Sequence, residues 1–294
     1  MTELALEVRN LKKSYRGFSL EDVSFEIPRG YVMGLVGPNG AGKTTIVKAI
    51  MNLVARDGGE VRVGGLDNLA DEVAVKARIG FVYDEPAFYL DCTLDEHRRA
   101  VAPLYPEWSD ADYERLVKRF ELPRDRKFKA LSHGMKTKFA LVLALSHGAD
   151  LLVLDEPTTG LDPVFRRELL DLLAEILEDE KKSILFSTHI VSDLERIADY
   201  VTFLRGGRIV LSIAQDELAE KWGVVRGDEA ALAHVREGDR HGVRRGAYGI
   251  EVLTSDAPAA RRSLGERAVV ERATLEEIMF LMTGEEGHVA PTRA

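Results

Sequence analysis

The chain has 294 residues, of which 45% are hydrophobic and 30% are charged, a balance typical of a soluble globular protein with one or two domains. Its net charge of −9 argues against extensive nucleic-acid binding, so no nucleic-acid partner is expected. The single cysteine, Cys92, excludes an intrachain disulfide and a cysteine metal cluster. The N-terminus lacks the features of a signal peptide, and no apolar run approaches the roughly 20 residues that span a bilayer. We therefore expect any work at a membrane to require a partner.

Alternating or short apolar runs predict several strands in the first third of the chain. Residues 4–11 and 23–27 alternate between apolar and polar side chains, and residues 59–65 form another short bounded run. Residues 31–36 are mostly apolar, and residues 78–83 are a further strand candidate. We expect antiparallel strands on both sides of the segment that follows residue 36.

That segment, at residues 37–45, reads GPNGAGKTT and matches the phosphate-binding pattern G-x-x-x-x-G-K-[ST]. It lies between the apolar run and a predicted helix at residues 46–51, and these flanks argue against a chance glycine turn. Glycines let backbone N–H groups curl around a phosphate, and the helix N-terminus adds partial positive charge. Lys43 can reach the β- and γ-phosphates, and the Thr44 hydroxyl can ligate Mg²⁺. The candidate phosphate-binding residues are Gly37, Pro38, Asn39, Gly40, Ala41, Gly42, Lys43, Thr44 and Thr45.

The middle of the chain, from residue 84 to about residue 145, predicts an inserted helical subdomain. Thr93 and Glu96 have the spacing of a capping box, and Ser109 is placed to open a second helix. Ser132 is a good N-cap for a third helix, and Gly134 permits close approach of another backbone.

Two buried strands are predicted next, and acidic or imidazole side chains follow each of them. Residues 151–154 are continuously apolar, as in a strand buried on both faces of a parallel sheet, and Asp155 and Glu156 come directly after. Beside a phosphate-binding loop, such an Asp can hold Mg²⁺ and such a Glu can accept a proton from water. His189 ends the strand at residues 183–187 and could hydrogen-bond a γ-phosphate. The alternatives are two solvated carboxylates and a structural histidine.

Strands that alternate with helices give an α/β layer fold. After about residue 218 no chemical motif remains, and short strands and helices predict a small α/β accessory domain at residues 219–284. Residues 285–294 have no periodicity and are expected to be disordered.

The order of these motifs over residues 1–218 resembles the ATP-binding subunit of ABC transporters. The series comprises the P-loop, a signature at residues 131–135, the strand before Asp155 and Glu156, the segment at residues 158–163, and His189. The resemblance implies a RecA-like P-loop NTPase core with an antiparallel β subdomain and a helical subdomain at about residues 84–145. It also implies ATP and Mg²⁺ as ligands.

The resemblance also implies individual roles. Glu156 would be the catalytic base and His189 the switch histidine, working with Lys43. Thr44, Asp84 and Asp155 would hold Mg²⁺. The remaining nucleotide contacts would come from Tyr15 stacking on adenine, Ser132 and Gly134 touching the γ-phosphate bound to the opposite subunit, and Asp162 at the dimer interface.

Three positions depart from the usual family pattern. His133 and Met135 replace a Gly and a Gln of the signature, and Asp84 stands where a glutamine is usual. Together with residues 104–108, these departures resemble ABC-2-type exporters of the YtrB kind. That likeness implies a separate membrane permease and a place at the inner face of the cell membrane.

The resulting hypothesis is an ATPase subunit that pairs with a second cassette around two ATP molecules and drives export through the permease. Residues 86–90 form an apolar loop that either docks on the permease or packs within the helical subdomain. Two other classes stay open. One is an ABC ATPase acting on ribosomes or DNA, although only one P-loop and no coiled-coil insertion are present. The other is a regulatory module that does not hydrolyse ATP, which Asp84 and His133 make conceivable.

Overall fold

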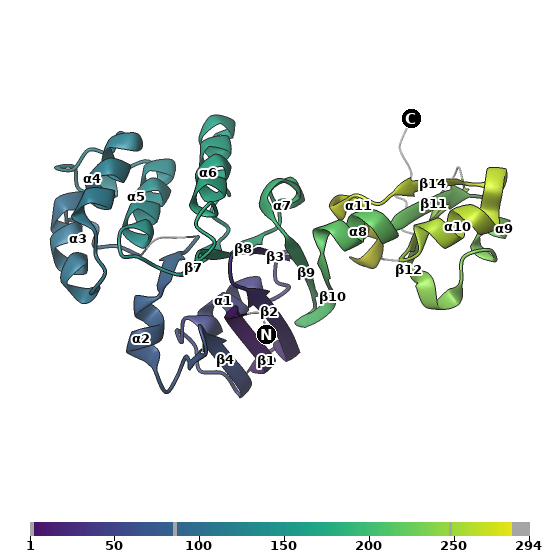
Figure 1. Cartoon of the computed structure of the whole chain (residues 1–294), viewed down its shortest axis with the longest axis horizontal. Helices are drawn as coiled ribbons and strands as arrows, with labels where there is room; N and C mark the ends of the chain where they lie inside the picture. The colour runs from purple at the N-terminus through teal and green to yellow at the C-terminus, as the bar shows by residue number, and fades with distance from the viewer. Residues whose placement is uncertain (1–2, 85–86, 247–248, 284–294) are drawn as a thin grey trace. The chain divides into compact units, whose positions relative to one another are not determined.

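The computed structural model describes residues 3–84, 87–246 and 249–283 (Figure 1). The chain divides into two compact units, Met1–Ile209 and Val210–Ala294. The boundary expected after residue 218 would cut helix α8 (Gln215–Lys221), which contacts α10 (Ala257–Leu264) of the second unit. The predicted disordered tail at residues 285–294 lies outside the described residues.

The first unit is organised around a six-stranded sheet in the order β10-β9-β3-β8-β7-β6. Its five strands from β9 to β6 pair in parallel. Every residue of β3, β7 and β8 is buried, which explains why apolar side chains dominate these three strands. Because the carboxyl ends of parallel strands meet at one edge, the segments after β3, β7 and β8 converge there. The strands are β3 (Val32–Val36), β6 (Ile79–Val82), β7 (Leu151–Asp155), β8 (Ser183–Thr188), β9 (Tyr200–Arg205) and β10 (Arg208–Ala214).

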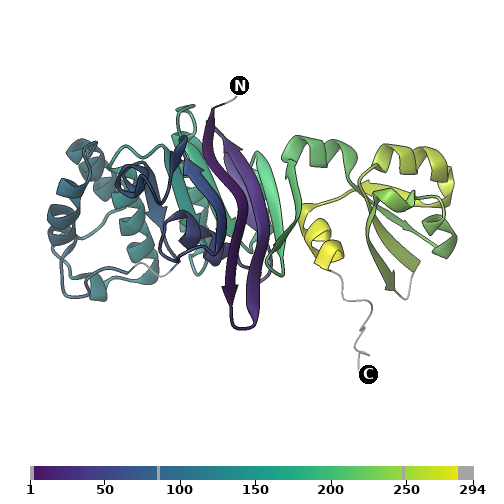
Figure 2. The same cartoon turned by 90° about the horizontal axis from the view of Figure 1, so that it is seen from below.

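A second, antiparallel sheet has the order β2-β1-β4-β5 and confirms the predicted β subdomain. Its strands are β1 (Leu4–Tyr15), β2 (Phe18–Pro28), β4 (Gly58–Val63) and β5 (Leu66–Asp67), the first two long and side by side (Figure 2). Helix α1 (Lys43–Ile50) shares one hydrophobic core with both sheets, since its Ile46 and Ile50 cluster with Leu6 of β1 and Val153 of β7. Helix α2 (Glu72–Ala77) leads into β6. This core fixes the start of α1 against the parallel sheet.

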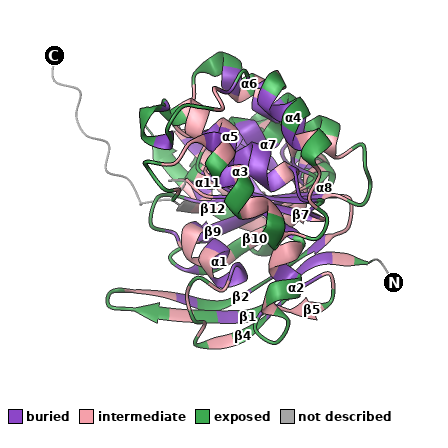
Figure 3. Cartoon of the chain, turned by 90° about the vertical axis from the view of Figure 1, so that its left-hand side faces the viewer, coloured by how far each residue is buried: buried purple, intermediate pink, exposed green. Residues whose placement is uncertain are grey.

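The helical subdomain consists of α3 (Leu94–Val101), α4 (Asp110–Arg119) and α5 (His133–Leu145), with short turns at Ala102–Leu104 and Phe128–Ala130. The predicted capping box is present: the Glu96 N–H donates to the Thr93 hydroxyl at 3.2 Å, and the Thr93 N–H donates to the Glu96 carboxylate at 2.7 Å. Ser109 caps α4 and Ser132 caps α5, as expected. Helix α5 is largely buried (Figure 3).

The apolar loop before α3 packs in part within the helical subdomain, and its docking on a permease stays a prediction. The Phe88 ring packs on Phe128 with 5.0 Å between centroids and also meets the rings of His97 and Phe139. Tyr89 and Leu90 are 79% and 57% exposed. Pro86, at the start of the predicted loop, lies outside the described residues. The phenyl ring therefore belongs to the subdomain core, while its two neighbours face outward.

Two helices complete the first unit, α6 (Pro163–Ile176) and α7 (Val191–Ile197). Asp162 caps α6 by accepting hydrogen bonds from the N–H groups of Val164 and Phe165, each at 3.0 Å. Proline at the first position of α6 fits the same start, because its missing N–H would have no partner there.

The second unit contains an antiparallel sheet in the order β12-β13-β11-β14, with its helices interspersed as β-α-β-β-α-β. This order and connectivity are those of a ferredoxin-like fold. The prediction of an α/β unit missed the short helix α9 and the strand β12. The sequence of β12, RHGVRRG, is charged and largely exposed at the sheet edge. The elements are β11 (Gly223–Gly227), α9 (Glu229–Leu232), β12 (Arg240–Gly246), β13 (Gly249–Thr254), α10, β14 (Val269–Arg272) and α11 (Leu275–Thr283).

Candidate nucleotide-binding site

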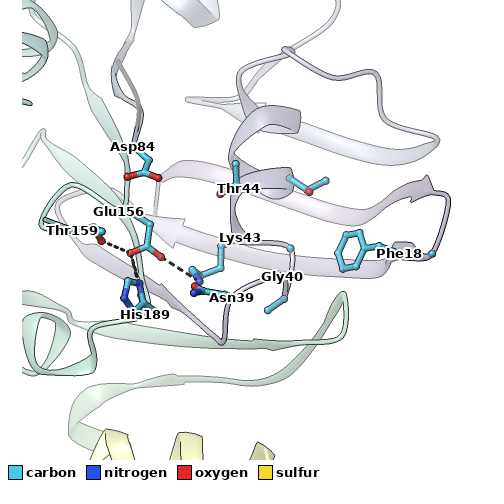
Figure 4. Close-up of a pocket in the computed structure, with 13 residues that line it drawn as sticks. Phe18, Asn39, Gly40, Lys43, Thr44, Asp84, Glu156, Thr159 and His189 are labelled. Atoms are coloured by element: carbon cyan, nitrogen blue, oxygen red, sulfur yellow. Dashed lines mark hydrogen bonds and ion pairs between the residues drawn. The ribbon is translucent and has the colours of Figure 1, made fainter. Parts of the chain in front are cut away.

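A cavity of about 640 Å³ opens at the edge of the parallel sheet where β3, β7 and β8 end (Figure 4). The turn between β1 and β2 also contributes to it. The cavity is lined by Gly17, Phe18, Asn39, Gly40, Ala41, Gly42, Lys43, Thr44, Thr45, Asp84, Glu156, Thr159 and His189. Residues that are far apart in the sequence but were expected to share a phosphate site therefore face one space.

The loop before α1 is packed so tightly that two of its glycines are required. A Cβ on Gly37 would lie 2.2 Å from the carbonyl oxygen of Leu204, which is backbone and cannot turn aside. Gly42 has φ of +113°, and a Cβ there would lie 2.6 Å from a Leu20 methyl carbon and 2.8 Å from the Phe18 ring. These contacts hold the loop at the mouth of the cavity with α1 directly behind it.

The Lys43 side chain is held inside this loop. Its ammonium donates to the carbonyl oxygen of Gly37 at 2.8 Å and lies 3.3 Å from a carboxylate oxygen of Glu156. Pro38 offers a second carbonyl at 3.5 Å. Gly37 and Pro38 do not line the cavity. Their carbonyl groups instead position the Lys43 ammonium, whose side chain is only 6% exposed.

Asp155 ends β7 beneath the cavity and is fully buried. Its Oδ1 accepts a hydrogen bond from the Ser187 hydroxyl, whereas its Oδ2 has no hydrogen-bond partner. Burial raises the pKa of this carboxyl, and the nearby hydroxyl groups of Ser187 and Thr44 oppose that shift. A buried carboxylate oxygen left open beside a threonine hydroxyl fits Mg²⁺, which prefers hard oxygen ligands. In the described part of the chain, no group of three His, Cys, Asp or Glu residues could hold a metal ion.

Glu156 follows Asp155 with φ of +50°, a conformation that is uncommon for a residue other than glycine. Such strain clusters at functional sites, and here it turns the carboxylate toward the cavity. Its Oε2 lies 2.8 Å from His189 Nδ1 and accepts from the Thr159 hydroxyl at 3.0 Å (Figure 4). Glu156 and His189, predicted separately from two strand ends, are thus direct partners. Thr159 is a contact that the sequence did not indicate.

Besides Gly37 and Pro38, four predicted nucleotide contacts do not line the cavity. Tyr15 is 46% exposed at the end of β1, with the Lys13 ammonium 5.3 Å from its ring centroid, and it does not line the cavity. Phe18, across the same turn, does line it and is the aromatic residue that sequence reasoning missed. Ser132 and Gly134 lie at the tip of α5, and Asp162 caps α6. Their expected contacts with a second subunit stay predictions.

Gly134 differs from the P-loop glycines in one respect. A Cβ built on it would meet Leu161 at 3.8 Å and Phe165 at 3.9 Å, which are ordinary contacts. Among the residues that the structure describes, none therefore requires a glycine at the tip of α5.

Comparison with known proteins gives the same assignment. The ABC transporter family model matches residues 20–159. The ATP-binding protein YtrB of Bacillus subtilis (strain 168) is 32% identical over 218 residues, which cover 74% of each chain. The chain belongs to the ABC transporter family. The lantibiotic transport ATP-binding protein SrtF of Streptococcus pyogenes is 34% identical, over 72% of this chain and 91% of its own. A solved ATP-binding subunit of an ABC transporter is 33% identical, with a TM-score of 0.66 over 73% of this chain and 91% of its own.

The protein is therefore the ATP-binding and ATP-hydrolysing subunit of an ABC transporter, built on a P-loop NTPase fold. The P-loop residues Asn39 to Thr45 line the cavity described above. Among the described residues, no helix combines the length and the apolar character needed to cross a bilayer.

Proposed function

We propose that the cassette works as a closed pair, in which ATP on the P-loop of one subunit is covered by Ser132 and Gly134 of the other. The observation that carries this proposal is the division of the family motifs within a single chain. The cavity contains the P-loop, Glu156 and His189, whereas the tip of α5 is absent from its lining. A second cassette, either another copy or a sister subunit, would supply it. Gly134, which the described residues of its own chain do not require, would then allow close approach of the partner's phosphate.

The chemistry proposed within each site follows from the contacts around Glu156. Its carboxylate would accept a proton from the attacking water, with His189 and the Thr159 hydroxyl holding its orientation. The Lys43 ammonium, which lies beside Glu156 in this structure, would contact the phosphate oxygens and stabilise their negative charge. Thr44, Asp155 and Asp84 are the residues that would hold Mg²⁺, which supplies charge neutralisation at the phosphate oxygens.

We further propose that the transporter is an exporter and that its permease docks on an apolar groove of about 500 Å³ beside the helical subdomain. The Nod factor export ATP-binding protein I of Rhizobium johnstonii, which is 29% identical over 97% of this chain, supports export as the direction. The groove is lined by Phe81, Tyr83, Ala87, Phe88 and Tyr105 among others, and its Tyr83 directly precedes Asp84 of the nucleotide cavity. An apolar segment of the permease seated there would touch the strand that leads to the γ-phosphate end of the site. The subunit would then lie at the cytoplasmic face of the membrane.

The substitution Glu156→Gln tests the paired mechanism. A general base contributes about 10²- to 10⁴-fold to a rate, so steady-state turnover should fall at least about 100-fold. ATP binding should persist, because the amide leaves the P-loop contacts intact, and a pair should accumulate in MgATP on size-exclusion chromatography. Glu178→Gln, at an exposed carboxylate in the turn after α6, is the matched control. Turnover that survives in Glu156→Gln would refute the base assignment. Absence of ATP turnover in the wild-type protein would instead favour a regulatory module that does not hydrolyse ATP.

The docking surface is tested best at Ala87, which is exposed and lines the groove. Ala87→Asp should leave basal ATPase activity unchanged and abolish its stimulation by the permease in proteoliposomes, because a charge would be buried against an apolar segment. Phe88→Asp is a poorer test because the Phe88 ring is part of the subdomain core. Val73→Asp, at a side chain 85% exposed outside the groove, is the control. Full stimulation in Ala87→Asp would place the docking surface elsewhere.

A further inference from the structure

We propose that His133 is a positioning residue that connects the tip of α5 to the catalytic carboxylate of its own cassette. The inference rests on the paired mechanism above and assigns a role to one of the departures from the usual signature. His133 directly follows Ser132, which is expected to meet the partner's nucleotide.

The connection runs through two contacts of Thr159. His133 Nε2 lies 3.2 Å from the carbonyl oxygen of Thr159, and because a carbonyl only accepts, Nε2 must carry the proton and donate. The hydroxyl of Thr159 donates to Glu156 Oε2 at 3.0 Å, on the oxygen that also contacts His189. The Thr159 backbone N–H in turn donates to the carbonyl oxygen of Glu156 at 3.1 Å. Two hydrogen bonds therefore separate the signature helix from the group that would activate water.

The loop that contains Thr159 is anchored on its other side. The Thr158 hydroxyl is buried and donates to Asp193 at 2.7 Å, and Asp193 also accepts from Arg166 Nε at 2.7 Å. Gly160 has φ of +71°, and a Cβ on it would lie 3.5 Å from the His133 ring, so the loop passes directly against the imidazole. Because Thr158 is fixed, a displacement of His133 would act on the Thr159 peptide rather than shift the whole loop.

This arrangement makes each subunit sensitive to the nucleotide held by the other. Engagement of the partner's phosphate by Ser132 would move the tip of α5, and His133 would pass that movement to the Thr159 hydroxyl on Glu156. A glycine at position 133 has no side chain with which to make the contact. Histidine at position 133 thus links the partner's nucleotide site to Glu156 of its own chain, so that ATP binding at one site can change activity at the other.

The test compares His133→Gly with His133→Gln in the full chain, since the glutamine amide can still donate. Loss of one hydrogen bond that orients the base should lower kcat about 3- to 10-fold in His133→Gly. ATP affinity, measured with a fluorescent ATP analogue, should not change because His133 does not line the cavity. The Hill coefficient for ATP hydrolysis should fall toward one. His133→Gln should recover most of kcat and of the cooperativity.

A double-mutant cycle with Thr159→Val decides whether the two contacts form one path. If they do, His133→Gly combined with Thr159→Val should lower kcat no further than the larger single effect. Effects that multiply, equal losses in the glycine and glutamine variants, or an unchanged kcat in His133→Gly would overturn the proposal. Failure of Glu156→Gln to pair in MgATP would instead refute the paired mechanism, while the cycle would still report on the contact.

Discussion

The two units of the chain treat buried polar groups differently. Within the described residues, four buried side-chain atoms have no hydrogen-bond partner, and all belong to the first unit: His97 Nε2, Tyr113 Oη, His147 Nδ1 and Asp155 Oδ2. In the second unit, Arg226 contacts three carboxylates, those of Glu251, Glu271 and Glu277. The cassette thus keeps at least one buried polar atom available for a ligand, whereas the ferredoxin-like unit surrounds Arg226 with three carboxylates of its own. Buried polar groups without partners cost stability, so the difference can be tested by substitution.

The largest effect is expected at Gly37. Gly37→Ala would place a methyl group 2.2 Å from a backbone carbonyl, and overpacking of this kind costs typically about 3 kcal/mol at its upper end. We expect a lower free energy of unfolding and loss of ATP binding, because the Gly37 carbonyl also holds Lys43. Chemical denaturation and a nucleotide-binding assay measure the two losses.

Gly134→Ala is the matched comparison, since the added methyl group has ordinary surroundings in this chain. The melting temperature should not change, whereas ATP-dependent pairing in the Glu156→Gln background should weaken. If both alanine variants lost the same stability, the distinction between a glycine required by the fold and one required by a partner would be wrong.

Substitution of Asp155 should show how much stability the chain loses by burying a carboxylate oxygen that has no hydrogen-bond partner. Asp155→Asn should abolish turnover and raise the melting temperature at neutral pH, where a gain of about 1 kcal/mol corresponds to about 2–4 °C in a chain of this size. The raised pKa means that the folded state binds the proton more tightly than the unfolded state. The ionised wild type is therefore penalised above its folded pKa, and the advantage of the variant should shrink as the pH falls toward about 4. Melting curves across this range, without nucleotide, provide the measurement. A less stable asparagine variant at neutral pH would contradict the interpretation.

Arg226 tests the opposite treatment of charge in the second unit. Arg226→Met leaves three glutamates close together, and because the Arg226 side chain is 36% exposed we expect a loss of only about 1 kcal/mol after solvent screening. Burial opposes the lowered pKa of Glu277, but hydrogen bonds from Thr274 and Arg226 outweigh it. The lowered pKa of Glu277 stabilises the folded state above the pKa that Glu277 has in the unfolded chain, and this stabilisation is lost as the pH falls through the folded-state pKa. The free energy of unfolding of Arg226→Met should therefore fall less steeply with acid than that of the wild type. ATP turnover should stay at the wild-type level, and a large drop would tie the second unit to catalysis.

The chemical groups of the site could be predicted because their positions follow from chain topology. The P-loop pattern and the rule that parallel strands end at one edge were sufficient to bring Glu156 and His189 together. The contacts of Thr159 and His133 were not predictable in the same way, because they join two loops whose separation depends on how α5 packs. Phe18 was missed for a related reason: only the register of the β1–β2 turn decides which aromatic residue faces the cavity. Strand order in the second unit likewise follows from long-range pairing, which leaves little local signal in a charged edge strand such as β12.

The smallest effect is expected at Tyr113, whose buried hydroxyl oxygen lies outside the nucleotide cavity. Its side chain is fully buried, its hydroxyl has no partner, and burial raises its pKa to about 12. Tyr113→Phe keeps the ring beneath the guanidinium groups of Arg98 and Arg124 and removes only the unsatisfied oxygen. We expect the free energy of unfolding to stay level or rise by about 0.5–1 kcal/mol, with ATP turnover unchanged.

The pH dependence separates Tyr113 from a merely neutral site. A raised folded pKa gives stability that is complete below the ordinary value of 10 and is lost as the pH rises through about 12. Tyr113→Phe should therefore lose less stability than the wild type over this alkaline range, in urea titrations at matched ionic strength. A destabilised phenylalanine variant would mean that the hydroxyl has a partner in solution. In that case Asp155 would stand apart as the polar atom that the cassette keeps open for chemistry.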